Sequence, residues 1–139
     1  MNTLLLRLTK DFPDIQFSAS DRFIFTPPNS VFYPKTDNLS QENQNSLLLL
    51  HELGHCLLKH QDYGSEITLL KMEAQAWEKA KELVNKYQIP WDEDVKDDYL
   101  DSYRDFLHRR STCPFCQING YYSEQDSSYH CPNCEKTWH

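Results

Sequence analysis

The spacing of apolar residues divides the chain into a short first helix, a β-rich stretch and three longer helices. The first residues form an amphipathic pattern that predicts a helix ending before Pro13. β-branched and aromatic residues then cluster at 15–17, 22–25 and 31–33, with turn residues between the clusters. We expect three short strands in a small antiparallel sheet, the third strand just before the next helix.

The three later helices differ in how their apolar residues are arranged. Residues 46–60 are apolar nearly all round, which predicts a buried helix. Residues 66–87 carry a single apolar stripe, with Glu78 and Glu82 on the opposite face. Residues 92–110 open with acids and close with bases, which suits the helix dipole. The whole pattern predicts the α+β class.

The buried helix carries the sequence His51-Glu52-Leu53-Gly54-His55, the H-E-x-x-H motif of zinc-dependent peptidases. Histidines four residues apart lie on one side of a helix and can share a zinc ion. Glu52 points about 60° away from His55 around the helix, where it can take a proton from the attacking water. The alternative is that each buried histidine simply bonds a carbonyl, but three such groups in one buried helix need stronger compensation.

The third ligand of this predicted zinc site is not the nearest histidine. His60 lies about 180° from His51 around the helix, so it cannot reach the same ion while the helix persists. We expect His60 at the helix end, near the last carbonyls. The metzincin pattern needs a glycine at position 58 and a histidine at position 61, where this chain has Leu58 and Gln61.

Glu73 is the better candidate for two independent reasons. It lies in the middle of the apolar stripe of residues 66–87, where a lone carboxylate needs a partner. If one helix ends near His60 and the next begins near Glu66, the turn centres on residues 63–64, and position 73 then faces the motif. Glu66 instead suits the first helical turn after a Ser65 cap.

These two segments resemble the ImmA/IrrE-type metallopeptidases and the small gluzincins related to them. In that family the second segment reads Glu-Ala-x-x-Phe-Ala, and its glutamate is the third zinc ligand. Glu73 and Ala74 match this pattern, Trp77 replaces the phenylalanine, and Glu78 departs from the final alanine. The resemblance covers about residues 1 to 90. It implies a gluzincin-like metallopeptidase domain, which we place at residues 1–110, with residues 30–33 offering a free strand edge to a peptide substrate.

A second metal site is predicted near the C-terminus. Cys113 and Cys116 form one C-x-x-C pair, and Cys131 and Cys134 form another, at a separation typical of a four-cysteine zinc ribbon. We assign residues 111–139 to this structural zinc site, because so short a segment needs the metal to fold. Two disulfides are the alternative. Asn-Gly at 119–120 predicts a hairpin turn, and the remaining cysteine, Cys56, suits core packing.

Composition limits the partners of the chain. It has 139 residues with 39% hydrophobic residues and a net charge of −7, and it shows no long apolar segment and no export signal. We therefore expect a cytoplasmic protein without a membrane partner. In the ribbon, Glu124, Asp126 and Glu135 outnumber Lys136, so nucleic acid is disfavoured and a protein partner is favoured.

The leading hypothesis is a zinc metallopeptidase that hydrolyses peptide bonds, with Glu52 as the catalytic general base and His51, His55 and Glu73 as zinc ligands. The family resemblance implies a regulatory protein as substrate. One alternative is an SprT-like protease, which needs a third histidine that residues 61–107 lack. The other is a non-catalytic or autoinhibited binding module, with the ribbon over the cleft. A second electrophile stays open between Tyr63, Tyr33 and His108.

Overall fold

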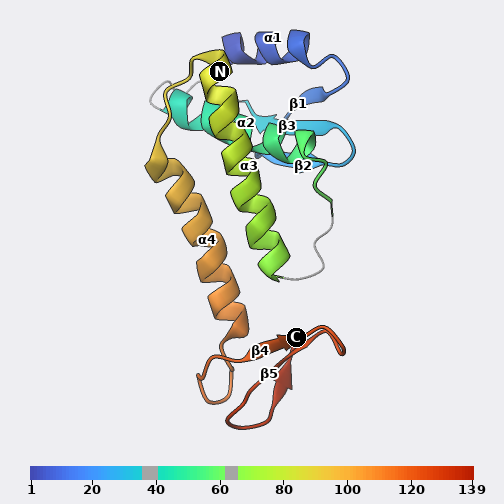
Figure 1. The fold of residues 1–139 in the computed structure, drawn as a ribbon, viewed down its shortest axis with the longest axis vertical. Helices are drawn as coiled ribbons and strands as arrows, with labels where there is room; N and C mark the ends of the chain where they lie inside the picture. Colours follow the sequence, from blue (N-terminus) through green and yellow to red (C-terminus); the bar gives the residue numbers. More distant parts are fainter. Residues whose placement is uncertain (36–40, 62–65) are drawn as a thin grey trace.

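The computed structural model describes residues 1–35, 41–61 and 66–139 and has the α+β architecture that the sequence predicts (Figure 1). The predicted turn at residues 63–64 and the Ser65 cap lie outside these ranges. The elements follow the order α1 (Asn2–Asp11), β1 (Gln16–Ser20), β2 (Ile24–Thr26), β3 (Ser30–Pro34), α2 (Glu42–Leu57), α3 (Glu66–Tyr87), α4 (Glu93–Ser111), β4 (Tyr121–Ser123), β5 (Ser128–His130) and β6 (Thr137–Trp138).

The motif helix α2 lies at the centre of the main core. Between Asn45 and Cys56 its side chains are buried nearly all round, as the lack of a polar face predicts. The helix α3 packs against α2 through its apolar stripe, and Trp77, Ala80, Val84 and Tyr87 join the core cluster there. Cys56 is also buried in this cluster, which confirms its packing role. Within the described ranges, no helix is both long and apolar enough to cross a membrane.

The first sheet is mixed, so the prediction of an antiparallel sheet was wrong. Its strand order is β1-β3-β2, with β3 parallel to β1 and antiparallel to β2. Val31 in β3 pairs with residues on both neighbours and is fully buried, whereas β1 is largely exposed. The most apolar strand therefore takes the centre, where both edges are covered. Residues 30–33 consequently offer no free edge, and β1 and β2 form the edges.

The helix α4 connects the main core to a second, smaller sheet at the opposite end of the molecule from α1 (Figure 1). Asp92 caps the start of α4 by accepting a hydrogen bond from the Asp94 amide at 3.0 Å. The small sheet has the order β4-β5-β6 with antiparallel pairs. Its hairpin joins β4 to β5, so the turn predicted at residues 119–120 was wrong.

Gly120 is required for a different reason than a turn. No glycine among the described residues has a positive φ angle. A Cβ atom on Gly120 would lie 2.5 Å from the Trp138 ring and 2.7 Å from the His130 carbonyl oxygen. The glycine therefore leaves room for the Trp138 ring and the His130 carbonyl just before β4, and the reason for a glycine here is close packing, not a turn.

Candidate metal centres

The helices α2 and α3 bring together the three residues that the sequence predicts as zinc ligands. The Glu73 carboxylate lies between two imidazoles, with Oε2 2.8 Å from His51 Nε2 and Oε1 3.2 Å from His55 Nε2. One ligand atom from each of the three residues lies within 4.8 Å of the others. All three residues are buried, and the most exposed of them, His55, is 7% exposed. This group can hold a metal ion.

The polar atoms of this group fit a metal better than they fit one another. His51 Nε2 and Glu73 Oε2 are close, yet neither has a hydrogen-bond partner among the described residues. Buried polar atoms without partners are costly, and a shared cation would satisfy both. Burial raises the pKa of Glu73, but His51 and His55 outweigh this and hold it at about 2. Glu73 is therefore a carboxylate, the form that binds metal.

Trp77 holds the His51 ring in place. The two rings stack with centroids 4.3 Å apart and an interplanar angle of 12°. Trp77 follows Glu73 by one helical turn on α3 and is 1% exposed. Trp77 therefore orients the first histidine of the motif.

Glu52 lies beside this group at the wall of a cavity of about 400 Å³. Its Oε1 atom is 3.5 Å from His51 Nδ1, and its side chain is 16% exposed, whereas Glu73 is almost covered. The wall of the cavity includes apolar side chains from β2, from the residue before it and from α3: Phe23, Ile24, Phe25, Leu69 and Met72. No described residue of the ribbon lines this cavity. Glu52 is thus the acid of the motif that a ligand in the cavity can meet.

The structure adds two tyrosines that the sequence reasoning missed. Tyr103 from α4 lines the cavity with Glu52, His55 and Glu73, and burial followed by the Glu73 carboxylate raises the pKa of its hydroxyl. The Tyr99 ring lies 6.3 Å from the His51 ring. Nothing local in residues 92–110 showed that α4 packs against α3 and brings Tyr103 to the cavity.

Two of the three electrophile candidates from the sequence, Tyr33 and His108, lie away from this cavity. Tyr33 lies in a groove against α1 on β3, and neither Tyr33 nor His108 lines the cavity described above. Tyr63 lies outside the described residues. Among the described residues, Tyr103 is the tyrosine that lines this cavity together with His55 and Glu73.

His60 lies closer to the site than predicted, because α2 ends earlier than predicted. The helix stops at Leu57, and Lys59 adopts a φ angle of 57° that turns the chain back. The His60 Nδ1 atom then lies 2.9 Å from His55 Nδ1. His60 is still not a member of the ligand group, and burial lowers its pKa. His60 contacts the Nδ1 atom of His55, on the side of that ring away from Glu73.

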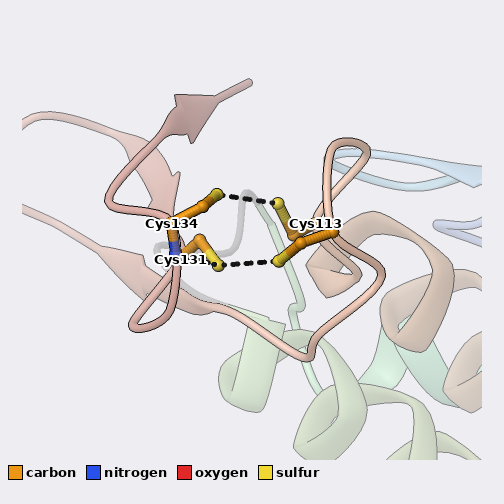
Figure 2. A group of neighbouring side chains, drawn as sticks. Cys113, Cys131 and Cys134 are labelled. Carbon is orange, nitrogen blue, oxygen red and sulfur yellow. Dashed lines mark hydrogen bonds between the residues drawn. The ribbon is translucent and has the colours of Figure 1, made fainter.

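The four cysteines of the ribbon converge as predicted (Figure 2). Cys113 Sγ lies 3.7 Å from Cys134 Sγ, and Cys116 Sγ lies 3.4 Å from Cys131 Sγ. A tetrahedral zinc with four sulfurs at about 2.3 Å separates the sulfurs by about 3.8 Å, whereas a disulfide would bring two of them to about 2.05 Å. The cysteines are free thiols in this arrangement and fit a single metal ion.

The two cysteine loops share one hydrogen-bond pattern. The Gln117 amide donates to the Cys113 carbonyl at 3.0 Å, and the Glu135 amide donates to the Cys131 carbonyl at 3.1 Å. Gln117 and Glu135 both adopt positive φ angles. A hydrogen bond from the Cys134 amide lowers the pKa of the Cys131 thiol, which favours the thiolate that binds metal. The backbone thus prepares both loops for the same ion.

Comparison with family models, with curated proteins and with solved structures found no match to the chain. The resemblance to ImmA/IrrE-type metallopeptidases therefore stays a prediction that rests on the motif residues.

Proposed function

We propose that this chain is a zinc metallopeptidase with a gluzincin-like core and a structural zinc ribbon. The observation that carries the proposal is the convergence of His51, His55 and Glu73, with unpartnered buried atoms, beside a cavity that Glu52 lines. Two imidazoles and one carboxylate form a ligand set of catalytic zinc sites, which leaves a further position for the reactants.

Each residue of the site has a separate task in peptide hydrolysis. A zinc ion held there would act as a Lewis acid that polarises the scissile carbonyl and acidifies the attacking water. The Glu52 carboxylate takes the proton of that water and passes it to the leaving amine. The protonated Tyr103 hydroxyl faces the same cavity and donates a hydrogen bond to the oxygen on which negative charge develops.

The strand β2 is the element that supports an extended peptide as the substrate. It is an edge strand, paired with β3 on one side, and residues 22–25 line the cavity. A peptide can pair with the free main chain of such an edge regardless of its sequence. The apolar wall formed by Phe23, Phe25 and Met72 favours an apolar side chain next to the cleaved bond.

The decisive experiment compares wild type with Glu52→Gln on a pool of proteome-derived peptides, analysed by mass spectrometry. Glu52→Gln should keep its metal content and lower the cleavage rate about 10²–10⁴-fold, because the amide cannot take a proton. Glu82→Gln makes the same change on the exposed face of α3 and should cleave like wild type. Full cleavage by Glu52→Gln would overturn the mechanism.

For the ribbon we propose a protein-binding role. The same exposed residues also favour the alternative that the whole chain is a non-catalytic binding module. Phe115, Ile118 and Tyr121 are exposed on the ribbon. Exposed apolar side chains on an acidic surface suit a protein partner better than nucleic acid. A chain that binds metal at both sites, yet cleaves no peptide in the pool, would favour this alternative.

A further inference from the structure

A row of hydrogen-bonding side chains continues from His55 away from the metal group. The Nε2 atom of His55 faces Glu73, and its Nδ1 atom lies 2.9 Å from His60 Nδ1. On the other side of the His60 ring, Nε2 lies 3.1 Å from Gln75 Oε1. The row therefore runs from the metal group to the surface, where Gln75 is exposed.

Both ends of the row are placed by the helices that supply the ligands. The His60 amide donates to the His55 carbonyl at 3.0 Å after the chain turns at Lys59, which sets the His60 ring against the His55 ring. Gln75 comes from α3, two residues after Glu73. The row thus ties the end of α2 to the helix that carries the third ligand.

With the Gln75 amide oxygen facing His60, the row fixes which nitrogen of His55 carries the proton. An amide oxygen only accepts, so Gln75 Oε1 requires a proton on His60 Nε2. A neutral His60 then has a free lone pair on Nδ1, which accepts the proton of His55 Nδ1. This leaves the lone pair of His55 on Nε2, where it faces Glu73. The opposite amide orientation would reverse every bond and place a proton on the metal side.

We propose that His60 and Gln75 are positioning residues that hold His55 in its metal-binding tautomer and orientation. The proposal rests on the metal site of the proposed function. Neither residue is a ligand: the ligand group consists of His51, His55 and Glu73. Outer partners of metal-bound histidines fix the ring and raise its basicity, and their loss weakens metal affinity about 10–100-fold.

The test measures zinc affinity, not activity, in the full chain with the ribbon preloaded with zinc, by competition with a chromophoric chelator. We expect His60→Leu to weaken binding about 10–100-fold. His60→Asn offers an amide oxygen near the position of Nδ1 and should keep most of the affinity. The carboxylate of Gln75→Glu can only accept a hydrogen bond from His60 Nε2, so this variant should bind zinc more tightly than wild type.

Two controls make the result decisive. Asn85→Asp adds the same charge as Gln75→Glu at another exposed position of α3 and should not change the affinity. Gln75→Leu changes only an exposed side chain and should weaken binding even if His60→Leu fails to fold. Equal affinity of Gln75→Leu and wild type would overturn the proposal and leave the proposed function standing. A wild-type chain that binds zinc only in the ribbon would overturn both.

Discussion

Gly54 sets how closely the two ligand helices approach. A Cβ atom at this position would lie 2.6 Å from the Ala76 carbonyl oxygen, which belongs to the backbone of α3 and cannot rotate away. Gly54 lies next to His55, and Ala76 lies one turn after Glu73. The pair of small residues therefore controls the distance between the histidines and the carboxylate.

Gly54→Ala should weaken zinc binding more than it weakens the fold. The extra methyl group pushes α3 outward, at a typical overpacking cost of about 1–3 kcal/mol, while alanine returns about 1 kcal/mol of helix propensity. Zinc affinity and urea unfolding of the metal-free chain measure the two effects separately. Gln44→Ala, an exposed change on α2, should alter neither. Wild-type affinity in Gly54→Ala would contradict this role of the glycine.

At the scale of single residues, the sequence predicts ligands better than it predicts their surroundings. Glu73 was predictable because a carboxylate in an apolar stripe leaves a local signature. The place of His60 was not, because it depends on the positive φ angle of Lys59, for which a lysine gives no signal. Tyr103 was missed because its role depends on where a distant helix crosses the site.

Among the elements, α4 differs most between its role predicted from the sequence and its role in the structure. Its end charges indicated only a favourable helix dipole, yet it carries Tyr103 into the cavity beside the candidate ligands. The strand order of the first sheet could likewise not be predicted from local patterns. Val31 pairs with residues of both β1 and β2, and nothing in the sequence of these strands shows which of them lies in the middle. Element positions could be predicted, but pairings between distant elements could not.

Tyr103→Phe tests the contribution of α4 to the reaction. Because the phenol donates a hydrogen bond only as charge develops, its loss should lower kcat about 10²-fold while KM changes little. Zinc content should stay at the wild-type level. Steady-state kinetics on a peptide cleaved by wild type measures the split, with Tyr121→Phe in the ribbon as the matched control. A rise in KM at constant kcat would instead assign Tyr103 to substrate binding.

A hydrogen bond between α1 and α3 makes the stability of the fold depend on pH in the alkaline range. The Tyr87 hydroxyl donates to Asp11 Oδ2 at 2.7 Å, and burial followed by Asp11 raises the pKa of Tyr87 to about 12. An ordinary tyrosine ionises near about pH 10. The contribution of the Tyr87–Asp11 contact to the free energy of unfolding is therefore complete below about pH 10 and is lost as the pH rises through about 12.

Tyr87→Phe should lower the free energy of unfolding by about 1 kcal/mol at neutral pH. It should also reduce the loss of stability between neutral pH and about pH 11, because the variant has no phenol to ionise there. Urea unfolding at both pH values measures the difference, and Tyr121→Phe again serves as control. An unchanged alkaline loss in Tyr87→Phe would contradict the assignment.

In the whole molecule, one candidate metal group lies between α2 and α3, the other lies in the ribbon, and α4 connects the two parts. The last turn of α4 is bonded to the ribbon: Trp138 Nε1 donates to the Arg110 carbonyl at 2.8 Å, and the Gly120 amide donates to the Ser111 carbonyl at 2.6 Å. The ribbon therefore satisfies carbonyls that a helix end leaves open. The predicted boundary between residues 110 and 111 falls inside this bonded turn, so the two parts share α4.

Removing one ribbon ligand should separate the two metal groups. Cys134→Ser should lower the zinc content from two ions per chain to one. A four-thiolate site loses most of its zinc affinity when one of its thiolates is removed. The ribbon should then unfold and become sensitive to proteolysis after residue 110, while the core keeps its ion at His51 and its cooperative thermal unfolding. Cys56→Ser is the matched control, since this thiol is buried in the core and belongs to neither group, and it should keep both ions. Loss of both ions in Cys134→Ser would instead mean that the core cannot hold its metal without the ribbon at the end of α4.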